Sequence, residues 1–151
     1  MAEAYEFTKV NAFAEDPARH IVSFSTEAGK SISIQDEGPG KLDIQFVRRA
    51  VVEHKAIFVA YDPDTGFCHF AVPFNEDYVD SIEFVREPQP GLKVRLVRRP
   101  SFLFLLPTHP RFEALRKILE NANEARQLVW VGTFPGDSEI LDVSKPKPFL
   151  D

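Results

Sequence analysis

Glycine spacing is the feature that most constrains this chain. Glycine adopts the positive φ angles that tight turns require. Polar breaks that contain glycine and recur at short intervals between apolar segments are typical of consecutive β-hairpins. Of the seven glycines, only Gly132 lies inside an apolar segment, and the breaks hold Gly29, Gly38, Gly40, Gly66, Gly91 and Gly136. We therefore expect a chain in which sequential strands pair antiparallel.

The register of the first hairpin can be derived from the segment HIVSFSTEAGKSISI at 20–34. A three-residue loop that ends in glycine sets Phe24 opposite Ile32 on an apolar face, while serines face one another on the other side. Adding KLDIQFV as a third strand predicts a meander over 21–47. Residues 47–55 fit a strand continuation, a bulge or one helical turn.

The next hairpin, KAIFVAY-DPDTG-FCHFAVP, is apolar on both faces. Its expected register places Val59 opposite His69 and Phe58 opposite Phe70. A pair of this kind is typical of the centre of a sheet that is covered on both sides. Two further hairpins follow from the same reasoning, with Glu83 opposite Arg95, Ile82 opposite Leu96 and Val131 opposite Leu141.

One helix is predicted, over about 109–126, with Thr108 as its N-cap and Pro110 in its first turn. Its apolar positions recur at helical spacing, at Phe112, Leu115, Leu119 and Ala122. The expected fold class is α+β: a strongly bent antiparallel sheet or partly open β-barrel of about ten strands, packed against this one amphipathic helix.

We expect a single domain over 1–151, because neither a long linker nor a long-period repeat is visible in the sequence. Residues 1–19 are expected to form an irregular or edge-strand arm. The tail at 144–151, SKPKPFLD, has proline at alternate positions and is expected to be extended.

Composition places the chain among soluble proteins, and we expect a cytoplasmic one. The sequence is 44% hydrophobic and 27% charged, which is normal for a globular domain. The single cysteine rules out an internal disulfide and fits a reducing compartment. The N-terminal segment lacks the pattern of a signal peptide, and no apolar stretch approaches the roughly 18 residues of a membrane span.

Two groups of residues are candidate binding sites. Trp130 shares its expected strand face with Asp142 and a glycine, which leaves room for a ligand to stack, and His69 is a candidate at the mouth of such a pocket. Each has a plainer interpretation, as a packed ring or a hydrogen-bonded core residue. The second group is Lys93, Arg95 and Arg99, which form a candidate patch for an anion or an acidic partner, although opposite charges across strands are ordinary sheet stabilisation.

No catalytic, metal-binding or cofactor motif is present, so no metal or cofactor is expected and enzymatic activity is left uncertain, with the balance toward none. The net charge of −5 makes nucleic acid an unlikely partner. The leading hypothesis is a soluble binding or protein-interaction module that is homo-oligomeric, because apolar strand surface at 56–72 and 101–106 exceeds what one helix covers. The alternatives are a small-ligand pocket protein or enzyme with its site near Trp130, and a nucleic-acid binder that uses the basic strand face.

Overall fold

The computed structural model describes residues 3–87 and 89–148. Within these residues it contains two helices, α1 (Gly40–Glu53) and α2 (Phe112–Ala125), and antiparallel strands. The strands are β1 (Ala4–Thr8), β2 (Asn11–Asp16), β3 (Ile21–Ser25), β4 (Ser31–Gln35), β5 (Ile57–Tyr61), β6 (Cys68–Val72), β7 (Asn75–Val85), β8 (Gly91–Leu96), β9 (Leu103–Leu105), β10 (Leu128–Gly132) and β11 (Asp142–Ser144). The predicted α+β class is confirmed. The described strands form no closed barrel, and the single expected helix is α2.

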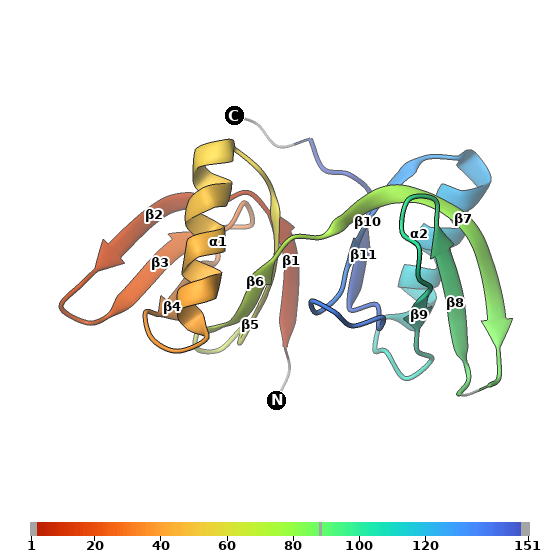
Figure 1. Cartoon of the computed structure of the whole chain (residues 1–151), viewed down its shortest axis with the longest axis horizontal. Coiled ribbons are helices and arrows are strands. Elements are labelled where there is room, and N and C mark those ends of the chain that lie inside the picture. Colours follow the sequence, from red (N-terminus) through yellow and green to blue (C-terminus); the bar gives the residue numbers. More distant parts are fainter. Residues whose placement is uncertain (1–2, 88, 149–151) are drawn as a thin grey trace. The chain divides into compact units, whose positions relative to one another are not determined.

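The chain divides into two compact units, and Figure 1 shows that each consists of strands and one helix. Of the described residues, unit 1 comprises 3–73 and unit 2 comprises 74–87 and 89–148. Each unit is described by itself below. The expected single domain stays a prediction.

In unit 1, β5 pairs with β1 and β6, and β3 pairs with β2 and β4. The core lies between these strands and α1, and Ile44, Val47 and Ala50 are the buried residues of the helix. Burial of their side chains removes apolar surface from water, which is the main source of stability for such a unit. Only Lys9 and Val10 separate β1 from β2, so the two strands follow one another with a sharp bend.

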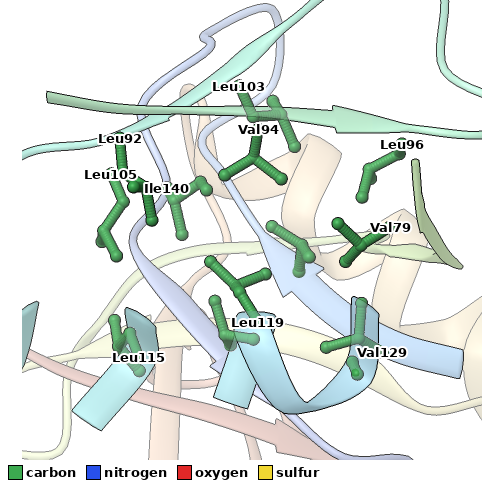
Figure 2. Close-up of a cluster of buried hydrophobic side chains, with 13 residues drawn as sticks. Val79, Leu92, Val94, Leu96, Leu103, Leu105, Leu115, Leu119, Val129 and Ile140 are labelled. Carbon is green, nitrogen blue, oxygen red and sulfur yellow. The ribbon is translucent and has the colours of Figure 1, made fainter. Parts of the chain in front are cut away.

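In unit 2, the strand order is β11-β10-β7-β8-β9. The long strand β7 pairs with β10 through its first half and with β8 through its second half, with an irregularity between Val79 and Ser81. Figure 2 shows Leu115 and Leu119 of α2 pointing into the same space as Val94 and Leu103 of the sheet. One face of the sheet is therefore closed by the helix.

The two units have the same topology. In each unit, the first strand segment has two pairing partners. Its first half pairs with the strand that follows the helix, and its second half pairs with the strand that comes next in the sequence. This segment is β1 with β2 in unit 1 and the single strand β7 in unit 2. A lone parallel bridge repeats as well, joining Ser33 to Phe67 in unit 1 and Phe104 to Glu139 in unit 2. The sequence gives no visible sign of this repeat.

The ends of the two helices show the repeat at single-residue level. His54 and Arg126 follow α1 and α2 with left-handed φ angles of 56° and 52°. In each case the next N–H bonds back to the carbonyl of a buried alanine, from Lys55 to Ala50 and from Gln127 to Ala122, both at 3.0 Å. These are Schellman-type helix ends. A residue with a left-handed φ angle turns the chain, so that following N–H groups bond to carbonyls of the last turn that have no partner within the helix.

The third strand of the predicted meander is wrong, because residues 40–47 belong to α1. The segment KLDIQFV alternates apolar and polar residues, but Ile44, Val47 and Ala50 also share one helical face. Gly40 permits the helix to start where it does, since a Cβ there would lie 2.1 Å from the carbonyl oxygen of Gln35.

The first hairpin register is confirmed, with Phe24 opposite Ile32. The other three registers are wrong. The register irregularity at Ala60 and Tyr61, where His69 is the extra residue on β6, contributes to placing Phe58 opposite Val72. The five-residue turn after β7 lies one residue earlier than expected and places Ile82 opposite Val94. A longer loop places Val131 opposite Val143. Strand content was therefore predicted more accurately than pairing.

The terminal segments were also the subject of predictions. The expected arm at 1–19 contains β1 and β2, and its residues 1–2 lie outside the described part of the chain. In the expected tail, Ser144 ends β11, residues 145–148 have no regular secondary structure, and 149–151 lie outside the described part.

Candidate functional site

The best candidate site lies on the face of the unit 2 sheet that points away from its core. Alternate residues of β8, beginning with Leu92 and Val94, are buried against α2. Because side chains alternate along a strand, Lys93 and Arg95 lie on the opposite face. The pairing of Lys93 with Phe104 places this phenylalanine on the same face.

Lys93 and Arg95 both lie beside an aromatic ring. The Lys93 ammonium is 3.8 Å from the centre of the Phe102 ring, and the Arg95 guanidinium carbon is 5.7 Å from it. Both distances are within the range of cation–π attraction. Phe102 nevertheless keeps 37% of its surface exposed. We name Lys93, Arg95, Phe102 and Phe104 the aromatic–cationic face.

Carboxylates border this face. Glu83 on β7 is directly opposite Lys93, and an Asp80 carboxylate oxygen is 3.6 Å from Arg95 Nε. Glu139 is bridged to Phe104 on the other side. The side chains of Arg95 and Asp80 are about half exposed, so water screens their attraction and the pair adds little to stability. The surface is thus mixed in charge around two phenylalanine rings.

The repeated topology supplies an internal comparison. In unit 1, Ser23 is opposite Ser33 and Ser25 is opposite Ser31. These four serines correspond to Lys93, Phe104, Arg95 and Phe102 of unit 2, because Ser33 and Phe104 hold the same bridge. The fold therefore forms with four serines at these positions, and folding alone does not require the aromatic–cationic face. The residue that pairs with this position in the parallel bridge differs in the opposite sense: it is aromatic in unit 1, Phe67, and polar in unit 2, Glu139.

The outer edge of β9 is occupied by the chain itself. The Phe104 N–H donates to the Ser138 carbonyl at 2.8 Å, and the Ile140 N–H donates to the Phe104 carbonyl at 2.8 Å. An added strand would need these groups. Any partner of this face therefore meets side chains rather than backbone. Arg99, the third predicted basic residue, lies in the bend after β8, and its Nε finds no hydrogen-bond partner among the residues described.

Trp130 is buried, at 5% exposure. Its indole N–H donates to a Glu76 carboxylate oxygen at 2.7 Å, and the Phe74 ring centre is 4.8 Å from its own. Trp130 and Asp142 share one sheet face, because Gly132 pairs with Asp142. The ring offers little surface for a ligand, so these contacts support the packed-ring interpretation.

Asp142 belongs to a polar cluster at the start of α2. Its Oδ1 accepts the Val143 N–H at 2.9 Å and lies 3.4 Å from an Arg111 nitrogen. Burial raises the pKa of the Asp142 carboxyl, while the Val143 hydrogen bond and the positive charge of Arg111 oppose that rise. The cluster connects the helix to β11 and is explained by structure.

His109 completes this connection. Its Nδ1 accepts the Arg111 N–H at 2.9 Å, and its Nε2 lies 2.7 Å from the Leu141 carbonyl oxygen. These partners assign a neutral ring with its proton on Nε2. The residue before α2 is Arg111, which makes no side-chain capping hydrogen bond. The predicted N-cap, Thr108, lies three residues earlier, in the preceding turn.

His69 lies on β6 in unit 1, with Nδ1 3.5 Å from a Glu3 carboxylate oxygen. Its neighbour Cys68 is half-buried, and burial, with a smaller contribution from the Asp43 charge, raises the pKa of its thiol to about 12. A thiol with such a pKa stays protonated at neutral pH and is a poor nucleophile.

A shallow pocket of about 200 Å³ lies in unit 1 beside the end of α1, lined by Lys9, Val10, Asn11, Ala50, Val51, His54 and Lys55. Two of its polar groups are engaged by carboxylates. The Asn11 amide bonds to Glu27 at 3.4 Å, and the Lys55 ammonium lies 3.4 Å from Glu53. The pocket thus has no clear preference for one ligand charge.

Across residues 3–87 and 89–148, no group of three or more histidine, cysteine, aspartate or glutamate side chains is arranged to hold a metal ion. Neither helix of the described chain has the length and apolar character needed to cross a membrane. Comparison with protein-family models, curated proteins and solved structures finds no match.

The sequence predicted Lys93 and Arg95 as a pair but missed Phe102 and Phe104 as part of the same face. The two phenylalanines alternate in SFLFLL with leucines that are buried at Leu103 and Leu105. The alternation of phenylalanine with leucine was the pattern that could have revealed this face. It was not decisive, because a uniformly apolar segment does not show which of its residues point outward.

Proposed function

We propose that this chain is a non-enzymatic protein-interaction module that binds its partner through the aromatic–cationic face of unit 2. The observation that carries the proposal is the replacement of four serines in unit 1 by Lys93, Arg95, Phe102 and Phe104 in unit 2. Exposed rings beside arginine are the composition that dominates binding energy at protein interfaces.

The mixed charge of the face favours a protein over nucleic acid. Glu83 and Asp80 lie beside the two cations and would repel a phosphate backbone, whose binding depends on a surplus of positive charge. A protein partner can match both signs, because its own surface carries both. Buried Trp130 offers no comparable support for a small-ligand site.

The test is a peptide-display selection against the purified protein, with the variant Lys93→Ser/Arg95→Ser/Phe102→Ser in parallel. This variant copies the unit 1 residues and leaves half-buried Phe104 in place. Binders selected on the native protein should bind the variant at least about tenfold more weakly, as expected when anchor residues are removed. The matched control, Ser23→Ala/Ser31→Ala in unit 1, should bind like the native protein.

Two results would contradict the proposal. Binders that do not distinguish the variant from the native protein would place the interaction elsewhere. Tight binding of single-stranded oligothymidylate that is lost in the same variant and falls steeply with salt would replace a protein partner by nucleic acid. Circular dichroism of each variant shows that the fold is retained.

A further inference from the structure

The charges around the aromatic–cationic face are complementary to themselves. Lys93 and Glu83 are directly opposite on adjacent strands, and both point away from the core. In a two-fold symmetric contact, residue i of one copy meets residue j of the other and the reverse also holds. A surface that carries neighbouring positive and negative groups in one register satisfies this condition.

The geometry points to a second copy of this chain as the partner, bound face to face across a two-fold axis that runs along the strands between β7 and β8. This inference rests on the proposed function and names its partner. Such an axis exchanges β7 and β8 without shifting residues along the strand. Lys93 of one copy therefore lies over Glu83 of the other, and two equivalent ion pairs form from one register.

The phenylalanines flank these ion pairs. Phe104 is the neighbour of Lys93 on β9, and Phe102 lies under the same ammonium. In the dimer the rings of both copies border the charged centre and shield it from water, which strengthens attraction between the charges. Unit 1 has no such arrangement at the same positions, because its strand pairs there are Ser23–Ser33 and Ser25–Ser31.

The size of the face sets the expected strength. A stable interface buries roughly 800 Å² on each partner, and a patch that covers parts of β7, β8 and β9 provides less. We therefore expect a dimer that forms in the micromolar range and exchanges with monomer. Charge reversal should act strongly on it, since like charges that face one another across an interface suppress binding.

The experiment uses two full-length variants with opposite charge reversals, Lys93→Glu and Glu83→Lys. Each alone places like charges across the two-fold axis, so dimerisation should weaken by at least tenfold in native mass spectrometry and sedimentation. Mixed in equal amounts, one variant presents acids where the other presents bases, and a heterodimer should form. Neither variant regains its own cross-strand pair in the mixture, so the rescue reports only contacts between chains.

Arg116→Glu on α2 is the matched control, since Arg116 pairs within its own helix with Glu113 and Glu120. It should dimerise like the native protein. The inference is overturned if the native protein stays monomeric up to high micromolar concentration, or if the mixed variants form no heterodimer. A monomer that still selects face-dependent peptides would overturn the second copy as partner and leave the proposed function standing.

Discussion

Ser33 and Phe104 make the same backbone hydrogen bond in two copies of one fold. The Ser33 N–H donates to Gly66 at 2.9 Å, and the Phe104 N–H donates to Ser138 at 2.8 Å. Both residues point away from the core of their own unit, so their side chains differ without consequence for packing beneath them. The fold of the two units therefore does not determine which side chain stands at this position.

Trp130→Phe tests the buried indole hydrogen bond to Glu76. Loss of a hydrogen bond to a charged acceptor should lower the free energy of unfolding by about 1.5–3 kcal/mol, measured by urea denaturation followed by far-UV circular dichroism. Glu76→Gln keeps an oxygen acceptor and should cost less. If Glu76→Ala, which removes the acceptor and leaves the ring in place, costs nothing, then ring packing, including the contact with Phe74, determines the effect.

His109→Ala removes two hydrogen bonds, to the Arg111 N–H and to the Leu141 carbonyl. We expect a loss of about 1–3 kcal/mol in the free energy of unfolding. Thr108→Ala should change it by less than about 0.5 kcal/mol, because exposed Thr108 is not the helix cap. Nitrogen chemical shifts of the imidazole should show the proton on Nε2, and a proton on Nδ1 would contradict the assignment.

Cys68 should react slowly with Ellman's reagent in the folded protein and quickly in urea. With a thiol pKa of about 12, only about one molecule in ten thousand carries a thiolate at pH 8. Asp43→Asn removes the smaller cause of the shift and should accelerate the reaction only modestly. Fast labelling of the native protein would show that the thiol is accessible and ionisable.

The same shift makes stability fall at alkaline pH. The folded thiol keeps its proton where the unfolded thiol, with a pKa near 9, has lost it. Its contribution is complete below pH 9 and is lost as the pH rises toward 12. Thermal unfolding of Cys68→Ala should show a shallower decline across this range. The pKa of Tyr61, raised by burial and by Glu6, adds a decline of the same sign that remains in the variant.

Asp142→Asn should reduce the fall in stability as the pH rises above the ordinary pKa of aspartate, 3.8. Burial raises the pKa of Asp142, so its contribution is present below the ordinary pKa of aspartate and is lost as the pH rises through the folded value. Asparagine can still accept the Val143 N–H. Arg111→Ala removes an opposing charge and should make the decline steeper, and an unchanged profile in both variants would contradict this origin.

Gly substitutions at the two helix ends test the repeat by stability. His54 and Arg126 adopt left-handed φ angles, which cost a residue with a Cβ roughly 1 kcal/mol relative to glycine. His54→Gly and Arg126→Gly should each raise the midpoint of urea denaturation, by similar amounts. A gain at one position and a loss at the other would show that one of these side chains stabilises its unit.

Local pattern predicted much of the strand content, because alternation and glycine-containing turns are set by neighbouring residues. The first hairpin was correct in register since Gly29 closes a short loop, with a φ of 83°. Helix α1 was missed because Leu42, Ile44 and Phe46 alternate as a strand would. In the structure Leu42 is 71% exposed, whereas Ile44 and Val47 of the same helix are buried in the core of unit 1.

The candidate site was predicted in part for a related reason. Lys93 and Arg95 are visible as alternating charges. Phe102 and Phe104 become distinguishable from the leucines beside them only when the sheet shows which side the helix covers. The correspondence with the serines of unit 1 depends on long-range pairing that no local pattern contains. Trp130 was attractive as a ligand site because its partner, Glu76, is distant in sequence.

The pairing of the bent first strand with the strand after the helix has a consequence for synthesis on the ribosome. β1 finds its partner only when β5 has been made, through pairs such as Phe7 with Phe58, and β7 likewise waits for β10. Every strand partner of β1–β6 precedes Pro73. Nascent unit 1 can therefore complete its strand pairing while unit 2 is still being translated, and the two sheets can form one after the other.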